Sequence, residues 1–482
     1  MKFIVKFFPE ITIKSRPVRK QLVKQLRDNL RTLLKPVDPA IEIQRDWDKL
    51  VVTTALTEPS VRRDIADVLG RTPGIAYFLD VLEYPFVDLD DACHKTAALW
   101  AQRLHGHSFV VRCKRSGEHA FSSTAAEQYI GGHLHQLTGA RVDLRNPDIV
   151  VRVEIRDDRL YVINERFAGL GGFPLGSQDS VVALMSGGFD STVASFLTMR
   201  RGVRTHFCFF NLGGREHERG VKEVSHFLWT RFGASSRVKF IAVPFEGVVA
   251  EILKNIDDSQ MGVVLKRMML RCATRIAERL DARALVTGES VAQVSSQTLT
   301  NLGVIERATD MLVLRPLITT GKGDIIQMAT EIGTEPFAAR MPEYCGVISV
   351  KPTTRAKLPR IEHEETKFDF AVLERALDEA RYLNIDEVAN DDEGPEVDVL
   401  SAPVVGSVII DVRHPSEQER SPLRAGNVGI EKIPFYELQN RFAELDPDTT
   451  YLLYCDKGVM SKLHAAHLAE LGFRNVKVYR PA

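Results

Sequence analysis

The sequence of 482 residues lacks any long apolar run and contains few cysteines. No stretch approaches the roughly 18 consecutive apolar residues of a membrane-spanning helix, so we expect no membrane association. The six cysteines include no C-x-x-C pair, which argues against a structural zinc site and against the disulfide framework of a small secreted domain. The short apolar run at the N-terminus is broken by Lys6 and precedes no small-residue cleavage site, so we expect a cytoplasmic protein.

The chain also has almost no net charge, because 63 Lys and Arg residues nearly balance 64 Asp and Glu residues. The two signs are unevenly distributed along it. Residues 1–35 contain ten Lys or Arg against two acidic residues, whereas residues 361–400 contain fourteen acidic residues against three Lys or Arg. Basic side chains release counterions when they contact phosphates, so the first segment suits RNA. A solvated basic helix over residues 17–35 is the alternative interpretation.

The length of the chain and the changes in its residue pattern predict several domains, since 482 residues exceed what one hydrophobic core usually supports. We expect small α+β units at residues 1–60 and 61–168, followed by a linker rich in Gly, Pro and Ser. An α/β unit at residues 176–395, ending in an acidic helical segment, and a short α/β unit at 404–482 follow. Strands that alternate with helices in the third unit indicate a parallel sheet, whose ligands bind at the carboxyl ends of the strands.

The apolar strand at residues 181–185 runs directly into S-G-G-F-D-S at residues 186–191, and a helix follows. Two glycines let backbone N–H groups approach an anion, the serine hydroxyls can donate, and the helix N-terminus adds partial positive charge. The segment therefore predicts a pyrophosphate-binding loop. A glycine turn capped by Asp and Ser is the alternative, but it leaves the many anion donors unexplained. A kinase-type P-loop ending in Gly321-Lys322 is excluded. Such a loop requires a glycine at position 316 and a Ser or Thr at position 323, where this chain has Pro316 and Gly323.

Two further segments are candidates for the same pocket. T-G-E-S at residues 287–290 follows a predicted strand, and polar Gln297 lies a few residues later. Lys266, on a predicted helix, would place a cation near phosphates if that helix borders the site. On pattern alone, Lys266 and Gln297 also fit ordinary surface positions.

Cys455 ends an apolar strand, and a helix begins within C-D-K-G-V-M-S. A helix N-terminus lowers the pKa of a thiol, so we expect a thiolate or persulfide to be stabilised there. Lys457 and Lys462 add positive charge. A strand-end cysteine packed as a small hydrophobic side chain is the alternative.

The strand, cysteine loop and helix, together with I-I-D-V-R at residues 409–413, resemble a rhodanese domain. Many rhodaneses carry arginines one and five places after the cysteine, where this chain has Asp456 and Met460. Thiosulfate would be held poorly without them. We therefore expect sulfur to arrive as a persulfide from a cysteine desulfurase.

Cys345 lies in M-P-E-Y-C-G at residues 341–346, beyond the last recognisable strand of the third unit. Its surroundings alone do not distinguish a working thiol from an ordinary one. A persulfide releases its sulfur by nucleophilic attack or by reductive cleavage, and a second thiol that performs the cleavage leaves a disulfide. This chemistry gives Cys345 a candidate role.

The order of these motifs resembles the tRNA 4-thiouridine synthetases (tRNA uridine 4-sulfurtransferases), in the long bacterial form with a rhodanese tail. The similarity extends over nearly the whole chain and includes C-K-R-S-G-E-H at residues 113–119 and T-G-E-S-V-A-Q-V-S-S-Q-T at residues 287–298. It implies four domains. These are an N-terminal ferredoxin-like domain, a THUMP domain that binds tRNA with it, a PP-loop ATP pyrophosphatase domain with a parallel sheet, and a rhodanese-like α/β domain.

The resemblance also implies which residues take part in the reaction. The implied contacts to ATP are Leu184, Met185, Ser186, Gly187, Gly188, Phe189, Asp190, Ser191, Lys266, Gly288 and Gln297. The implied catalytic residues are Asp190, Cys345 and Cys455, of which the two cysteines form a transient disulfide. We place RNA contacts on basic residues of the first two units, Lys14, Arg16, Arg19, Lys20, Lys114 and Arg115. ATP and Mg²⁺ are the implied cofactors, with no resident metal site.

The implied reaction is adenylation of O4 of uridine 8 in tRNA, followed by delivery of persulfide sulfur from Cys455. The implied partners are tRNA, a cysteine desulfurase and the sulfur carrier protein of thiamine synthesis, and homodimer formation is left open. Two other classes compete. An amidating or lysine-adding synthetase built on the same loop gives the rhodanese-like tail no purpose. A non-catalytic RNA-binding redox sensor predicts no AMP release.

Overall fold

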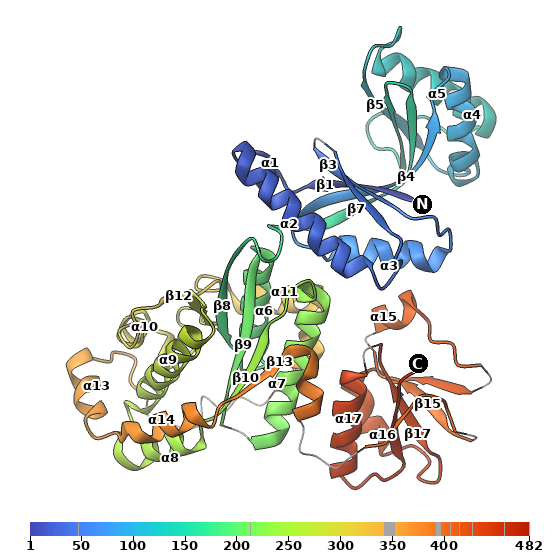
Figure 1. Cartoon of the computed structure of the whole chain (residues 1–482). Helices are drawn as coiled ribbons and strands as arrows, with labels where there is room; N and C mark the ends of the chain where they lie inside the picture. Colours follow the sequence, from blue (N-terminus) through green and yellow to red (C-terminus); the bar gives the residue numbers. More distant parts are fainter. Residues whose placement is uncertain are drawn as a thin grey trace. The chain divides into compact units, whose positions relative to one another are not determined.

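The chain divides into two units, Met1–Phe173 (unit 1) and Pro174–Ala482 (unit 2). A computed structural model describes all residues except positions 47, 213, 342–351, 392–396, 405, 414, 427, 457 and 482. Figure 1 shows the elements along the chain. Among the described helices, none combines the length and apolar character needed to cross a bilayer.

In the described part of unit 1, seven strands form one sheet in the order β2-β3-β1-β4-β7-β6-β5. The strands are β1 (Lys2–Phe7), β2 (Glu42–Arg45), β3 (Lys49–Thr53), β4 (Ile75–Pro85), β5 (Phe109–Ser116), β6 (Ile149–Arg156) and β7 (Arg159–Gly171). The helices are α1 (Pro9–Thr12), α2 (Arg16–Leu34), α3 (Pro59–Gly70), α4 (Leu89–Trp100), η1 (Ala101–Leu104) and α5 (Ser123–Thr138). Neighbouring strands are antiparallel except β5 and β6, which are parallel.

Two long strands run through both halves of this sheet, because β4 and β7 pair from Ile75 with Gly171 to Pro85 with Arg159. One core lies under α2 and α3 and includes Leu26, Ile65 and Phe78. A second core lies under α4 and α5 (Figure 1). The expected boundary at residue 60 therefore falls inside the first core.

The first α/β part of unit 2 has a sheet in the order β12-β11-β8-β9-β10-β13. Its strands are β8 (Gln178–Leu184), β9 (Val203–Asn211), β10 (Lys239–Pro244), β11 (Ala284–Val286), β12 (Leu312–Leu314) and β13 (Arg381–Asn384). Its helices are α6 (Phe189–Arg200), α7 (Gly214–Leu228), η2 (Trp229–Gly233), α8 (Glu246–Asn255), α9 (Met261–Arg279), η3 (Ser295–Gln297), α10 (Leu299–Glu306), α11 (Lys322–Ile332), α12 (Glu335–Ala338), α13 (Leu358–Glu365), α14 (Phe370–Asp378) and η4 (Ile385–Asp391). We call this part the adenylating part.

The sequence predicts that the acidic segment after residue 360 is helical throughout. In the structure, part of this segment is a strand. After α13 and α14 the chain forms β13, which pairs antiparallel with β10 from Asn384 opposite Lys239 to Arg381 opposite Ala242. Pairing with a strand distant in sequence overrides the local pattern here. The helical prediction is therefore wrong for Arg381–Asn384.

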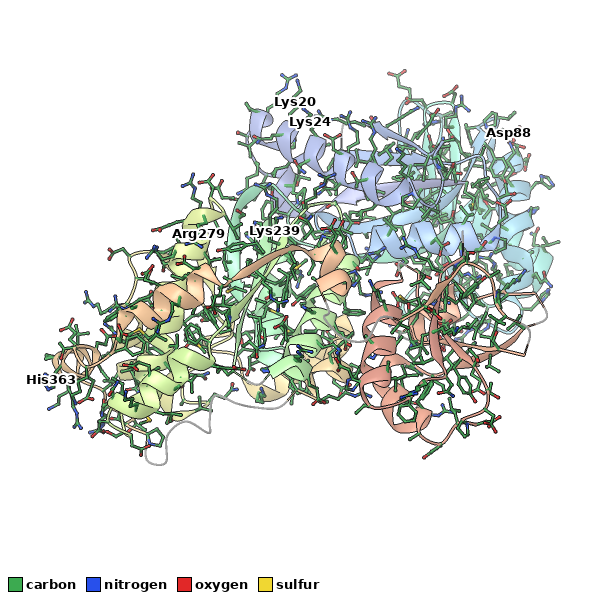
Figure 2. The ribbon with its side chains drawn as sticks, turned by 60° about the horizontal axis from the view of Figure 1, so that its bottom comes forward. Lys20, Lys24, Asp88, Lys239, Arg279 and His363 are labelled. Carbon is green, nitrogen blue, oxygen red and sulfur yellow. The ribbon has the colours of Figure 1, made fainter. Side chains whose placement is uncertain are left out.

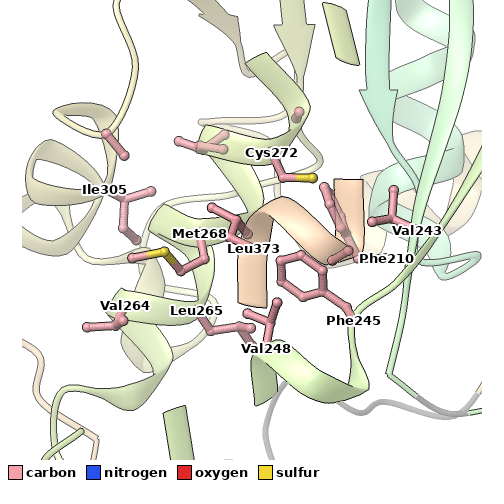
Figure 3. Close-up of a cluster of buried hydrophobic side chains, with 14 of the residues drawn as sticks. Phe210, Val243, Phe245, Val248, Val264, Leu265, Met268, Cys272, Ile305 and Leu373 are labelled. Atoms are coloured by element: carbon pink, nitrogen blue, oxygen red, sulfur yellow. The ribbon is translucent and has the colours of Figure 1, made fainter. Parts of the chain in front are cut away.

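Apolar side chains of α8, α9 and α14 pack against one face of the adenylating sheet. Figure 3 shows Phe210 and Phe245 near Leu373 of α14 and the α9 residues Met268 and Cys272. Each of these side chains is at least 94% buried. This core fixes the sheet, and so fixes the carboxyl ends of the strands that carry the site.

The second α/β part of unit 2, the rhodanese-like part, has a parallel sheet in the order β14-β18-β17-β15-β16. Its strands are β14 (Val399–Leu400), β15 (Val408–Asp411), β16 (Gly429–Lys432), β17 (Tyr451–Tyr454) and β18 (Val476–Tyr479). Its helices are α15 (Pro415–Arg420), α16 (Phe435–Phe442) and α17 (Val459–Glu470).

Candidate active site

The loop at residues 186–191, here the phosphate loop, connects β8 to α6 and is stabilised by its own hydroxyl groups. The Ser186 backbone N–H donates to Ser191 Oγ at 3.2 Å, and the two serine hydroxyl oxygens are also 3.2 Å apart. The Gly188 N–H points to Ser186 Oγ at 3.4 Å. Gly187 has a φ of +82°, a left-handed conformation that favours glycine. Backbone N–H groups and hydroxyls are thus gathered at the start of a helix, where an anion is favoured.

The phosphate loop lies at the point where strand order reverses in the sheet. From β8 the chain continues to β9 and β10 on one side, and then returns to β11 and β12 on the other. In open α/β sheets, ligands bind outside the carboxyl ends of the strands at such a reversal. Gly288, just after β11, lies against the loop, because a Cβ on Gly288 would be 2.5 Å from the backbone carbon of Asp190. The structure thus brings together the two segments that the sequence nominated.

Asp190 is held by residues from two other segments. Lys322 Nζ, at the start of α11, lies 3.0 Å from both carboxylate oxygens of Asp190. Gln293 Nε2 donates to Asp190 Oδ2 at 2.8 Å. The side chains of Asp190 and Lys322 are 24% and 41% exposed, so an incoming ligand can displace this pair.

Lys266 belongs to a second ion-pair group, centred on Glu289 of the T-G-E-S segment. Lys266 Nζ is 2.7 Å from Glu289 Oε1, and Arg315 Nε is 2.8 Å from Glu289 Oε2. Burial opposes ionisation of Glu289, but Lys266 and Arg315 outweigh it and hold the pKa of this carboxyl below its usual value. Gln297 Oε1 accepts from the Ser290 N–H at 3.3 Å and ties the same segment together.

Helix α7 and Met341 border the phosphate loop. His217 Nε2 donates to the Ser186 carbonyl at 2.9 Å, and burial lowers the pKa of His217, which keeps the ring neutral at neutral pH. The Met341 thioether fills the space beside two glycines. A Cβ on Gly187 would be 2.8 Å from Met341 Sδ, and a Cβ on Gly220 would be 2.4 Å from Met341 Cε. No larger residue fits at either position without moving Met341.

Cys455 lies at the turn between β17 and α17, here the cysteine turn, and is 8% exposed. Its Sγ accepts from the Ser461 backbone N–H at 3.3 Å and lies 3.4 Å from Ser461 Oγ. Gly458 turns the chain with a φ of +74°. A sulfur held by the N-terminal amides of a helix is stabilised as an anion. Lys457 lies outside the described residues.

Asp456, where many rhodaneses have arginine, is bonded to Arg413. Arg413 Nη1 donates to Asp456 Oδ1 at 2.8 Å, while its Nε and Nη2 donate to the Asp411 carboxylate at 2.9 and 2.7 Å. Burial opposes the charge on Arg413, but the bonds to Asp411 and Asp456 raise its pKa above the ordinary value. The arginine of the I-I-D-V-R segment therefore fixes the cysteine turn from the neighbouring strand.

Four other cysteines are buried in hydrophobic cores. Burial raises the pKa of Cys93 and Cys113 to about 11 and that of Cys272 to about 12, and raises that of Cys208 well above its usual value. These thiols stay protonated and unreactive at neutral pH. Cys345 lies outside the described residues.

The predicted RNA contacts form two groups within unit 1. The first group lies at the turn between α1 and α2 and on the first turns of α2: Lys14, Arg16, Arg19 and Lys20. Figure 2 shows Lys20 and Lys24 projecting from α2. The second group, Lys114 and Arg115, lies at the end of β5, the opposite edge of the sheet from β2. The structure therefore does not bring all six residues into one patch.

Several residues of the site were not identified from the sequence. Lys322 enters the sequence analysis only as part of a kinase-type P-loop, although a lysine that opens the helix after a strand of a parallel sheet is a signal for it. Gln293 and Glu289 stand in the T-G-E-S-V-A-Q segment, which was nominated as a whole. Arg315 directly follows β12, and Arg413 stands in the I-I-D-V-R segment.

Family models match the chain in four consecutive regions and confirm the expected fold classes. The matches are a ThiI ferredoxin-like domain at residues 2–78, a THUMP domain at 86–164, Thiamine biosynthesis protein (ThiI) at 176–370 and a rhodanese-like domain at 395–481. These four regions follow the order that the motifs predicted.

Relatives match the chain over its entire length. A "tRNA sulfurtransferase" from Azotobacter vinelandii is 57% identical over 485 residues, with both chains covered completely, and one from Pseudomonas syringae pv. tomato is 55% identical over 484 residues, also with complete coverage. A solved structure described as a 4-thiouridine synthetase–RNA complex with bound ATP matches with a TM-score of 0.70 at 25% identity. It covers 80% of this chain and 99% of its own. This chain therefore belongs to the tRNA sulfurtransferase family.

Proposed function

We propose that the protein transfers sulfur to a uridine of tRNA in a reaction driven by ATP. The observation that carries the proposal is the phosphate loop at the switch point, with Asp190, Gly288 and Lys322 gathered around it. ATP is also bound in the 4-thiouridine synthetase structure that this chain resembles. The amides and hydroxyls of the loop suit a pyrophosphate group.

Asp190 fits a role beside the phosphates. Mg²⁺ is commonly held by one or two carboxylates together with phosphate oxygens, and Asp190 offers one exposed carboxylate next to the loop amides. A bound Mg²⁺ supplies charge neutralisation at the phosphates. Asp190 would then exchange its bond to Lys322 for the metal, which leaves the ammonium group of Lys322 to face the phosphates. Lys266 and Gln297 are further proposed contacts to the nucleotide, and their bonds to Glu289 and to the Ser290 N–H support the proposal.

In the proposed first step, O4 of uridine 8 forms a bond to the α-phosphorus of ATP, and pyrophosphate leaves. The loop residues Ser186–Ser191 and the contacts at Leu184 and Met185 hold the nucleotide while this bond forms. Adenylation converts O4 into part of a good leaving group, AMP. The chain thereby prepares C4 of the base for attack by sulfur.

In the proposed second step, the terminal sulfur of a Cys455 persulfide forms a bond to C4, and AMP leaves with O4. The Cys345 thiolate then attacks Cys455 Sγ, which releases the thiolated uridine and forms a Cys345–Cys455 disulfide. An external dithiol supplies two electrons to reduce the disulfide in each turnover. Cys345 follows Met341 by four residues, and four extended residues span at most about 14 Å. Because Met341 packs against Gly187, that reach favours Cys345 as the partner thiol.

The remaining partners follow from the same chemistry. A cysteine desulfurase is the proposed persulfide donor, because Asp456 and Met460 replace the arginines that would hold thiosulfate. The proposed RNA contacts are the two basic groups of unit 1. Delivery of sulfur to the sulfur carrier protein of thiamine synthesis and formation of a homodimer are further proposals, supported by the family resemblance alone.

Nucleoside mass spectrometry of tRNA tests the function directly. Cells lacking the protein should lose 4-thiouridine from tRNA, and the gene on a plasmid should restore it. In vitro, purified protein with tRNA, ATP and a persulfide donor should release AMP and form 4-thiouridine in equal amounts. Unchanged 4-thiouridine in the deletion strain, or AMP formation without thiolation, would contradict the proposal.

A further inference from the structure

The backbone and the side chain of Ser461 both contact the sulfur of Cys455. Ser461 is the third residue of α17 and is fully buried. Its N–H donates to Cys455 Sγ at 3.3 Å, and its hydroxyl oxygen lies 3.4 Å from the same sulfur. One residue therefore presents two hydrogen-bond donors to the atom that is proposed to carry the persulfide.

The sulfur of Cys455 takes the place of a helix cap. The first N–H groups of a helix have no carbonyl partner within it, and the side chain of the N-cap residue usually accepts from the second or third of them. The N-cap of α17 is Gly458, which has no side chain to do so. Cys455 Sγ accepts from the third N–H instead. Because a helix begins with partial positive charge, this position favours a negatively charged sulfur.

The Ser461 hydroxyl has a second acceptor, the carbonyl of Gly458. Ser461 Oγ lies 3.2 Å from this oxygen, which also accepts from the Lys462 N–H at 3.2 Å. The carbonyl therefore keeps a donor when the hydroxyl turns to the sulfur. The hydroxyl can donate to Gly458 while Cys455 is a thiol and to the sulfur once it is a thiolate, and neither state leaves a buried acceptor unpaired.

The phosphate loop has a serine at the equivalent position. Ser191 is the third residue of α6, and its hydroxyl donates to the carbonyl of the N-cap residue Gly188 at 3.2 Å. The same hydroxyl oxygen lies 3.2 Å from Ser186 Oγ, at the start of the loop. In both turns, a hydroxyl on the third helical residue is shared between the N-cap carbonyl and the first residue of the turn. The proposed ligand of the phosphate loop is an anion, which supports the interpretation of Ser461 as a donor to an anionic sulfur.

Other ionisable side chains lie on the cysteine turn and on the elements beside it. Asp456 accepts from Arg413 Nη1 at 2.8 Å and from the Tyr454 hydroxyl at 3.1 Å. The Cδ of Arg480, after β18, lies 3.4 Å from the position of a Cβ on Gly458. These side chains include Arg413, Tyr454, Asp456, Lys462, His464 and Arg480. Replacing Ser461 by Ala leaves all of them in place, so it removes one donor to the sulfur and changes no charge.

We infer that Ser461 is a positioning residue that holds Cys455 as the thiolate able to accept sulfur. The inference rests on the proposed function of Cys455. In the loading step, Cys455 first loses its proton to solvent, and its thiolate then attacks the terminal sulfur of the donor persulfide. The S–S bond of the donor breaks, and the donor cysteine leaves as a thiolate.

The test measures the reactivity of Cys455 against pH in the full-length chain, in S461A and in S407A as the matched control. Alanine keeps the N–H at position 461 and favours a helix, so S461A removes only the hydroxyl. Ser407 of the same part is also buried, and its hydroxyl donates to the Val404 carbonyl at 2.7 Å. Each protein reacts with hydroxyethyl disulfide, a small uncharged disulfide, without tRNA or ATP. Mass spectrometry quantifies the mixed disulfide on the Cys455 peptide.

We expect S461A to raise the apparent pKa of this reaction by about one pH unit, the effect of losing a hydrogen bond to a charged group. Below the pKa, about tenfold less thiolate is then present, but that thiolate is about threefold more nucleophilic because it is more basic. S461A should therefore react about threefold more slowly than the unsubstituted protein below both pKa values and about threefold faster above them. The two profiles should cross, and S407A should follow the unsubstituted protein.

Coincident profiles of S461A and the unsubstituted protein would overturn the inference. A uniform decrease in the rate at every pH would also overturn it, because such a decrease indicates a structural role alone. Persulfide loading by a cysteine desulfurase below the pKa should be slowed about threefold in S461A, as the disulfide reaction is. Neither reaction uses tRNA or ATP. Absence of 4-thiouridine formation by the unsubstituted protein would therefore contradict the proposed function and leave the result on Ser461 standing.

Discussion

The phosphate loop and the cysteine turn share one backbone design but differ in their side chains. Each follows a parallel strand at a point where strand order reverses, and each leads into a helix. Each turns through a glycine with positive φ, Gly187 in one and Gly458 in the other. Each also holds an aspartate against a cation from another element, Lys322 for the first and Arg413 for the second.

The difference lies in what a ligand can displace. The Asp190–Lys322 pair is partly exposed, so a bound ligand can displace it. Arg413 is 3% exposed and is also bonded to Asp411, which is 1% exposed, so this arginine is fixed. The same backbone design therefore allows ligands to exchange at the phosphate loop and holds one sulfur rigidly at the cysteine turn.

Replacing Cys455 by Ser should have the largest effect, because it abolishes the proposed activity of the cysteine turn and leaves that of the phosphate loop. We expect C455S to form no 4-thiouridine over many turnovers, because a hydroxyl cannot carry a persulfide. AMP formation with tRNA and ATP should persist, since the phosphate loop is untouched. Mass spectrometry of digested tRNA and an assay of AMP measure the two activities. Sustained 4-thiouridine formation by C455S would remove Cys455 from the mechanism.

Replacing Asp190 by Ala should have the complementary effect. AMP formation should fall about a hundredfold or more, because the carboxylate proposed to hold Mg²⁺ beside the reacting phosphates is lost. D190N keeps the size of the side chain and removes its charge, so it should be equally impaired. Persulfide on Cys455, measured after loading by a desulfurase, should be unaffected. Normal AMP formation by D190N would show that the charge of Asp190 is not required.

The two cations that hold these aspartates should respond differently to truncation. R413A leaves buried Asp411 without its partner, and breaking a buried ion pair costs about 3–5 kcal/mol, so the rhodanese-like part should melt at a lower temperature. K322A removes a partly exposed ion pair, which contributes at most about 1 kcal/mol to stability. K322A should instead slow AMP formation about 10- to 100-fold, the effect expected for losing a hydrogen bond to a charged group. Calorimetry measures the stability of both variants, and AMP assays measure their adenylation rates. A loss of stability in K322A as large as that in R413A would contradict the prediction.

The smallest expected effect concerns the approach of Gly288 to the phosphate loop. A Cβ there would lie 2.5 Å from the Asp190 backbone carbon, so G288A should raise KM for ATP and destabilise the adenylating part by about 1–3 kcal/mol. G303A is the matched control, because a Cβ on Gly303 in α10 meets nothing within 4 Å. G303A should be neutral or slightly stabilising. Equal KM values for ATP in the two variants would show that the close approach is unimportant.

The sequence predicted local elements well where the signal was local. The phosphate loop, the T-G-E-S segment and the turn at Cys455 all follow strands, and the structure places each at a carboxyl end. What it missed depends on distant contacts. β13 forms because β10 offers an edge to pair with, and Lys322 reaches Asp190 across 132 residues of chain. Neither contact leaves a periodic pattern in the sequence around it.

The boundary predicted at residue 60 also depends on a local pattern. The basic helix and the following strand read as a complete small unit, but the side chains that complete its core come from α3 and β4. Similarly, the sequence predicts RNA contacts in two basic groups without relating them in space, and the sheet order places β5, which carries Lys114 and Arg115, at the edge opposite β2. Which strands share a sheet is set by pairing between segments far apart in the chain.

The long pairing of β4 with β7 bears on how unit 1 is made during synthesis. β4 pairs with β1 on one side, but its other edge pairs with β7, whose last residue is Gly171. Until β7 has left the ribosome, a nascent chain therefore exposes the unpaired edge of an eleven-residue strand. Such an edge readily pairs with other chains. We therefore expect truncations that end before β7 to aggregate, and translation pauses before that point to make the nascent chain dependent on chaperones.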